Sequence, residues 1–114
     1  MRTNFKMEDS NITMTKGDSV SFNVIVQDPD NNIIAVDSAY FTCKKLRTDE
    51  TKVFQKSLNA GIWQDETGLT VRIAPQDTAN VDAGLYFYDC QIGVEDDIYT
   101  ILKGILTIEQ DVTD

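Results

Sequence analysis

The sequence contains no histidine, only two cysteines and no long apolar run. Without histidine the chain lacks the usual general base, the base of Ser/His and Cys/His nucleophile pairs, and the commonest metal ligand. Cys43 and Cys90 stand apart, without the Cys-x-x-Cys spacing of a structural zinc site. The six glycines are scattered singly, so no phosphate-binding loop is present. We therefore expect no enzymatic activity, no cofactor and no metal.

Basic residues are also scarce, with 10 Lys and Arg against 19 Asp and Glu, which gives a formal net charge of −9. Such a chain repels nucleic acid, because binding there depends on cations that neutralise phosphates. No segment approaches the roughly 20 apolar residues needed to cross a bilayer, so we expect no membrane partner. The N-terminus carries charge without an apolar run behind it, and no signal peptide is visible. At 114 residues the chain is expected to form a single domain over 1–114, with 1–10 and 110–114 peripheral or flexible.

The sequence does contain many short segments that alternate apolar and polar residues, with turn signals about every ten residues. This pattern predicts an all-β fold, an antiparallel immunoglobulin-like β-sandwich of seven or eight strands. The expected strands lie at 11–15, 19–27, 38–46, 53–58 (a short edge strand), around 62–63, at 69–74, from 85 into a hairpin at 94–97, and at 98–108, with one helical turn within 75–81.

The turn Asp82-Ala83-Gly84 leads into a strand whose alternate residues, beginning with Tyr86, share one face. This resembles the tyrosine corner of immunoglobulin-like domains, in which the tyrosine hydroxyl bonds back to the main chain a few residues upstream. The resemblance implies a bond from Tyr86 to the backbone near Asp82 or earlier. The alternative is an ordinary core tyrosine. We assign Asp82, Gly84 and Tyr86 to a structural corner.

The cysteines depart from the antibody pattern. A cysteine follows the corner tyrosine by two residues in antibody domains, and Tyr88 holds that place in this sequence. Cys43 belongs to the third expected strand rather than the second. The third and sixth strands are neighbours in such folds, so the two cysteines could lie close together within one sheet. We expect two reduced, buried thiols, since free cysteine is among the most buried residue types.

The last expected strand is apolar at both parities, which indicates either cover on both faces or a bulge at Gly104. Apolar residues therefore remain for the outer face of the sheet that the third, sixth and seventh strands form. The last strand adds one of its two alternating sets, either Tyr99, Ile101 and Ile105 or Leu102 and Leu106. Together these apolar residues predict a contiguous patch of the kind that binds partners. The alternative is that residues 1–10 or a bulge cover the excess. The candidate partner-binding residues are Tyr40, Leu85, Phe87, Tyr99, Ile101 and Ile105.

Two further features have a functional and a structural interpretation. The acidic clusters at 28–32 and 95–97 could supply calcium ligands. However, Ala39 stands where the calcium loop of helix-loop-helix proteins needs a Glu, and turn residues explain both clusters better. Trp63 could stack on a sugar ring, but no second aromatic residue stands at a fixed spacing. Packing at the sandwich edge is the favoured interpretation.

Three short motifs resemble small structural proteins of tailed phages and prophages of Gram-positive bacteria, in particular the immunoglobulin-like N-terminal domain of phage baseplate upper proteins. They are the turn at 16–18, the corner at 82–89 and the last strand with its tail at 99–113, and the resemblance covers roughly Asn11 to Thr113. It implies a non-enzymatic tail or baseplate protein that contacts other phage structural proteins or itself, in the host cytoplasm before assembly and then in the virion. The alternative is a bacterial surface or secreted module that binds carbohydrate or a host protein.

Overall fold

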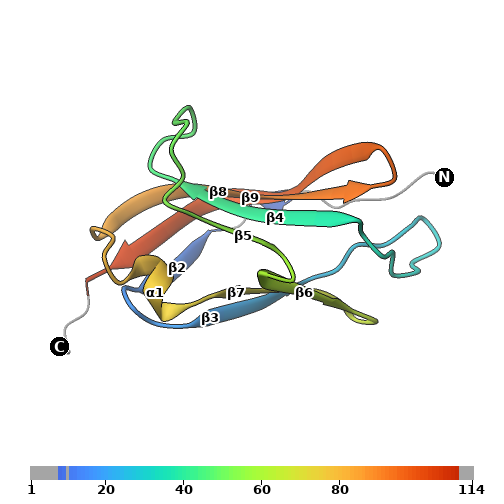
Figure 1. Ribbon diagram of the computed structural model, residues 1–114, viewed down its shortest axis with the longest axis horizontal. Coiled ribbons are helices and arrows are strands. Elements are labelled where there is room, and N and C mark those ends of the chain that lie inside the picture. Colours follow the sequence, from blue (N-terminus) through green and yellow to red (C-terminus); the bar gives the residue numbers. More distant parts are fainter. Residues whose placement is uncertain (1–7, 10, 111–114) are drawn as a thin grey trace.

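The protein is a two-layered β-structure, described by a computed structural model for residues 8–9 and 11–110 (Figure 1). The described residues form nine strands and one short helix. These are β1 (Glu8–Asp9), β2 (Ile12–Thr15), β3 (Val20–Val24), β4 (Ser38–Lys44), β5 (Phe54–Leu58), β6 (Gly61–Asp65), β7 (Gly68–Ile73), α1 (Pro75–Thr78), β8 (Gly84–Val94) and β9 (Asp97–Glu109).

The strands follow the order β1-β9-β8-β4-β5-β6-β7-β3, with β2 also paired to β9. One layer contains β9, β8 and β4, the other contains β6, β7 and β3, and a short parallel pairing of β5 with β6 joins them. Parallel pairing also attaches β1 and β2 to β9, whereas the remaining neighbours are antiparallel. The predicted all-β, immunoglobulin-like β-sandwich is therefore confirmed, but the sheet is mixed and not antiparallel throughout, because β1 and β2 pair parallel with β9 and β5 pairs parallel with β6. The strand count exceeds the expected seven or eight because β1 lies in the segment that the sequence indicated as peripheral.

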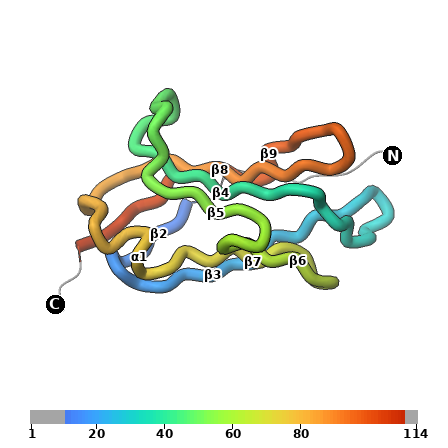
Figure 2. Tube along the Cα trace, viewed as in Figure 1, coloured from blue at the N-terminus to red at the C-terminus, as the bar shows by residue number. Residues whose placement is uncertain are grey.

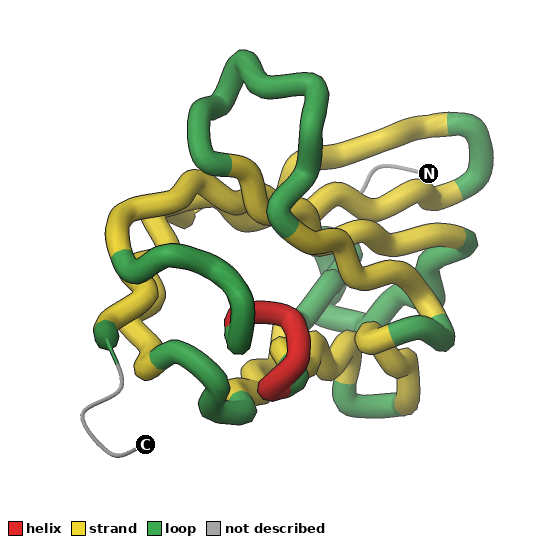
Figure 3. Tube along the Cα trace, turned by 60° about the vertical axis from the view of Figure 1, so that its left-hand side comes forward, coloured by secondary structure: helices red, strands yellow, loops and turns green. Residues whose placement is uncertain are grey.

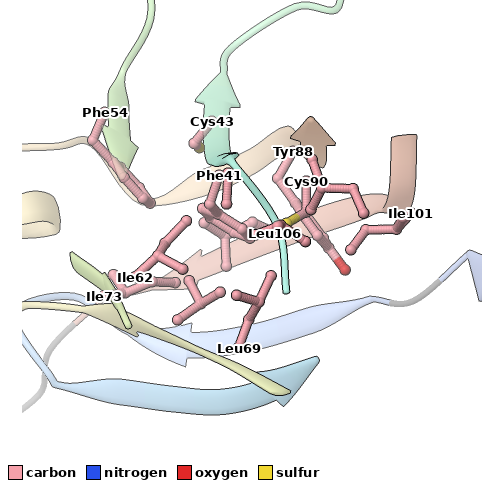
Figure 4. Packing of buried hydrophobic residues seen from close by; sticks show 14 of the residues in the cluster. Phe41, Cys43, Phe54, Ile62, Leu69, Ile73, Tyr88, Cys90, Ile101 and Leu106 are labelled. Atoms are coloured by element: carbon pink, nitrogen blue, oxygen red, sulfur yellow. The ribbon is translucent and has the colours of Figure 1, made fainter. Parts of the chain in front are cut away.

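The period of two in the sequence explains why these segments are strands, because each strand places alternate side chains on the core. In β4 the core-facing residues are Ala39, Phe41 and Cys43, each at most 1% exposed. The matching sets of β7 and β8 are also buried, and side chains from the two layers meet in one core (Figure 4). The core-facing residues of β7 and β8 are Leu69, Val71, Ile73, Tyr86, Tyr88, Cys90 and Ile92.

The prediction of 53–58 as an edge strand was wrong. β5 pairs antiparallel with β4 on one side and parallel with β6 on the other, so it lies inside the strand order. The Lys56 side chain on this strand forms an ion pair, with 2.6 Å between its Nζ and Asp77 Oδ2. Asp77 also accepts a hydrogen bond from the Ala74 amide, 2.7 Å, at the start of α1. The predicted helical turn is thus confirmed, and its first turn is fixed by an acidic side chain.

A cluster of aromatic rings surrounds Phe41 in the core, and one of its contacts joins the two layers. Phe41 of β4 stacks on Tyr88 of β8, with ring centroids 5.0 Å apart. Its other neighbours are Phe22 of β3, edge-on at 5.6 Å, and Phe54 of β5 at 6.1 Å. Tyr88, which stands at the position of the antibody cysteine, therefore stacks within its own layer, and of these three contacts the one between Phe22 and Phe41 joins the layer of β3 to the layer of β4.

Cys43 and Cys90 are free, buried thiols, as the sequence predicted. Burial raises the pKa of each thiol to about 12, in the case of Cys90 with a smaller contribution from Asp89. The thiolate is the nucleophilic form, so both residues should be inert in the folded protein. We expect a colourimetric thiol reagent to label neither cysteine at neutral pH until denaturant is added, and then to label both. Rapid labelling of one thiol under native conditions would contradict this burial.

Candidate partner-binding face

The tyrosine corner is present at the start of β8. The Tyr86 hydroxyl donates a hydrogen bond to the Asp82 carbonyl oxygen at 2.5 Å, and the side chain is 4% exposed. Gly84, between them, has a φ of +152°, which a residue with a side chain rarely adopts. The Lys45 ammonium lies 4.6 Å from the Tyr86 ring centroid and donates to the Leu85 carbonyl at 3.2 Å. All three residues assigned to the corner are therefore brought together, and they orient β8.

The register of β8 determines which predicted residues share the outer face of the layer formed by β4, β8 and β9, which we call the outer face. Phe87 pairs with Lys44 of β4 and with Ile105 of β9. Leu85, two residues before Phe87 and on the same face of β8, is 57% exposed. Leu85, Phe87 and Ile105 thus form an apolar group at one end of the outer face.

Tyr40 lies on the same outer face and is 43% exposed, but it is not part of this group. It pairs with Gln91, and the pair Thr42–Asp89 lies between it and Phe87. The prediction of one contiguous apolar patch was therefore wrong for Tyr40, because polar residues interrupt the sheet surface between the two aromatic rings.

The last strand contains a bulge, which the sequence predicted as one of two alternatives. The bulge is located at Ile101 and not at Gly104, because Cys90 pairs with Leu102 whereas Gln91 pairs with Thr100. An extra residue reverses the inward and outward alternation. Ile101 is consequently buried in the core at 4% exposure, and Tyr99 packs against the core as well. Assigning Ile101 to the partner-binding set was wrong, Tyr99 faces the core rather than the patch, and Ile105 alone keeps the predicted outward position on β9.

A pocket of about 410 Å³ opens on the outer face between β4, β8 and β9. We call it the outer pocket. Its lining includes the cations Lys44, Arg47 and Lys103 and the carboxylate of Asp89. Arg47, from the loop 45–53 that projects from the sandwich (Figure 3), places its guanidinium 4.7 Å from the centroid of the Phe87 ring. Three cations thus converge on a single site of a chain whose net charge is −9.

Electrostatics distinguish the outer pocket from an ordinary solvated surface. Burial raises the pKa of the Asp89 carboxyl, and the nearby Lys44 ammonium opposes this shift. Within the described residues the ion pair is the one between Lys56 and Asp77. None there involves the pocket cations Lys44, Arg47 and Lys103. A partly buried carboxyl with a raised pKa and available cations in a concave site is typical of a binding site. The pocket can bind an anionic group beside an aromatic ring.

Sequence reasoning missed the outer pocket. Its cations come from three segments that only the fold brings together, namely the end of β4, the following loop and the middle of β9. The strand alternation could have identified Lys44 and Asp89, since it places both side chains on the face of the sheet that points away from the core. Arg47 lies in a loop, where no such period applies.

The sequence raised two other candidates, a calcium site in the acidic turns and a sugar-binding role for Trp63. Asp28 accepts hydrogen bonds from the amides of Asp30 and Asn32, both 2.9 Å, and the Asn32 bond lowers its pKa most. Its carboxylate therefore stabilises the turn. Among the described residues no three His, Cys, Asp or Glu side chains are grouped to hold a metal ion. Trp63, on β6, is 48% exposed, so about half of the side chain is buried and half faces solvent.

No family model matches the chain, and no curated protein matches it. A solved structure of extracellular domains 3–5 of Drosophila OTK is similar, with a TM-score of 0.41 and 16% sequence identity. The match covers 98% of this chain and 36% of that one, so the chain spans about a third of the similar structure. In the described part of the chain, no helix has the length and apolar character to cross a membrane.

Proposed function

We propose that the chain is a non-enzymatic structural protein of a tailed phage or prophage, from the tail or baseplate, which acts through protein–protein contacts on the outer face. The observation that carries the proposal is the outer pocket with its apolar border. Phe87 lines the pocket together with three cations, and Leu85, two residues earlier on the same face of β8, is 57% exposed. Aromatic residues and arginine are the types enriched where proteins bind one another.

Two observations support the phage assignment in particular. The motifs at 16–18, 82–89 and 99–113 resemble phage structural proteins. The layers meet through buried apolar side chains, including the contact between Phe22 and Phe41, while both cysteines are free, so folding requires no oxidising compartment. We place the protein in the host cytoplasm before assembly and in the virion afterwards. The partners are other phage structural proteins or further copies of the chain.

The test is incorporation into particles. Phage particles are purified from the strain that encodes the chain, and the protein is quantified by mass spectrometry in the wild type and in a variant with Leu85→Asp and Phe87→Ser. Because the variant removes the apolar border and adds a charge, we expect about tenfold less protein per particle. The matched control is Trp63→Ser, an exposed aromatic on the other layer, which should be incorporated like the wild type. Absence of the wild-type chain from the particles would refute the phage role, and equal incorporation of the face variant would refute the use of this face.

One observation favours the alternative, a surface or secreted module that binds carbohydrate or a host protein. Trp63 is 48% exposed and pairs across the sheet with Thr70, which places an aromatic ring beside a hydroxyl. Reproducible sugar binding on a glycan array that is abolished by Trp63→Ala would support this second candidate.

A further inference from the structure

Charge is unevenly distributed along the molecule. Three loops, at 25–37, 64–68 and 94–98, contain eight Asp and Glu residues and no Lys or Arg. Hydrogen bonds connect them: the Asp37 amide donates to the Gly93 carbonyl at 2.8 Å, and the Val36 amide donates to the Gln64 Oε1 at 2.6 Å. All three lie at the same end of the sandwich, away from α1 (Figure 2). The molecule therefore has a strongly acidic end, whereas the outer pocket on its sheet face is basic.

The most prominent part of the acidic end is the turn between β8 and β9, residues 94–98, which we call the hairpin tip. Glu95, Asp96 and Asp97 are exposed, and Ile98, at 74%, is the most exposed large hydrophobic residue in the part of the chain that the structure describes. The tip has a fixed conformation, because the Glu95 amide donates to Asp37 Oδ2 at 2.8 Å and β8 and β9 pair up to Val94–Asp97. It presents three carboxylates, those of Glu95, Asp96 and Asp97, and an isoleucine on a preformed turn.

The outer pocket is complementary to this tip. Lys44, Arg47 and Lys103 outnumber the single carboxylate of Asp89, and Leu85 with Phe87 supplies an apolar border for an aliphatic side chain. We propose that the outer pocket binds the hairpin tip of a second copy of the chain, with Glu95 and Asp96 among the cations and Ile98 against the apolar border. The inference rests on the proposed function and deepens it, because it names the partner of the same face.

The occupant must belong to another molecule. Asp89 and Glu95 are six residues apart along one continuously paired strand, a separation of about 20 Å that keeps a tip away from its own pocket. Two copies of charge −9 repel each other, but this repulsion is screened beyond about 8 Å at physiological ionic strength. The short-range contacts inside the pocket therefore determine whether the copies associate. If two copies exchange tips reciprocally, the contact closes a two-fold dimer, and if each copy docks on a further copy, it builds a ring or a filament.

The experiment is a charge exchange followed by sedimentation velocity. One variant reverses the pocket (Lys44→Glu with Lys103→Glu), and the other reverses the tip (Glu95→Lys with Asp96→Lys). The wild type should associate with increasing concentration, and each variant alone should associate at least about tenfold more weakly. In an equimolar mixture of the two variants both contacts again join opposite charges, so association should return to the wild-type level. Matched controls outside both surfaces, Arg72→Glu and Asp18→Lys, should behave like the wild type.

A wild type that stays monomeric at every concentration would overturn the inference, and so would a mixture that remains as weak as the separate variants. Incorporation into particles separates this result from the proposed function. If the wild type is monomeric but the pocket variant is lost from particles, the pocket binds a different structural protein: the second copy is then wrong while the phage role stands. If the charge exchange restores association but the chain is absent from particles, self-docking stands without the phage role.

Discussion

Replacing Phe41 by alanine should lower the free energy of unfolding by about 4 kcal/mol. The Phe41 ring is fully buried and contacts aromatic residues from three other strands, with Tyr88 at 5.0 Å and Phe22 at 5.6 Å. Its removal therefore leaves a cavity between the layers and also eliminates favourable ring contacts. Urea denaturation monitored by circular dichroism measures the loss. A domain of this size has a total stability on the order of 5–15 kcal/mol, so the variant should be close to unfolding at growth temperature.

Tyr40→Ala is the matched control, because Tyr40 is the preceding residue on the same strand but points to the outer face. Its ring is 43% exposed, and we expect a loss below about 1 kcal/mol. Equal losses in the two variants would show that the aromatic cluster around Phe41 does not stabilise the core.

Replacing Tyr86 by phenylalanine should cost about 2 kcal/mol, although only one oxygen atom is removed. The hydroxyl donates to the Asp82 carbonyl at 2.5 Å in a buried position, and its loss leaves that acceptor without the bond. Thermal and chemical unfolding of the variant measure the effect. Tyr40→Phe removes a hydroxyl from an exposed ring and should change stability by no more than a few tenths of a kcal/mol. A Tyr86→Phe variant as stable as the wild type would contradict an energetic role for the corner.

The corner also predicts a pH dependence. Burial, followed by the neighbouring Asp82 and Cys43, raises the pKa of the Tyr86 phenol above its ordinary value of about 10. The unfolded chain therefore loses this proton first, and the contribution of Tyr86 is complete below about pH 10 and declines above it. The stability difference between the wild type and Tyr86→Phe should accordingly be constant from pH 6 to about pH 9 and narrow at more alkaline pH.

The strands and the corner could be predicted from the sequence because both depend on local patterns. Alternation placed Phe41 and Cys43 in the core, and the resemblance of residues 82–86 to a tyrosine corner implied the hydroxyl bond that the structure contains. The position of the bulge could not be predicted in the same way. Ile101 and its neighbours are apolar at both parities, so the sequence does not distinguish which residue is left unpaired.

The functional face was less predictable, because it depends on register between distant segments. Leu85, Phe87 and Ile105 were identified as surplus apolar residues, and the structure does place them together. Tyr40 was grouped with them only because it has the same orientation. The register relative to β8 separates it by the pair Thr42–Asp89. Lys44, Arg47 and Lys103 appeared in the sequence as scattered charges, and the fold alone makes them one site.

The outer face as the contact surface is tested most directly by backbone NMR of the wild-type protein at increasing concentration. The amide signals that shift should belong to the outer pocket, including Lys44, Phe87 and Lys103, and to the hairpin tip at 94–98. Signals of β6 and β7 around Trp63 should stay in place. Shifts confined to Trp63 and its neighbours, with the pocket and tip unchanged, would contradict the outer face as the contact surface.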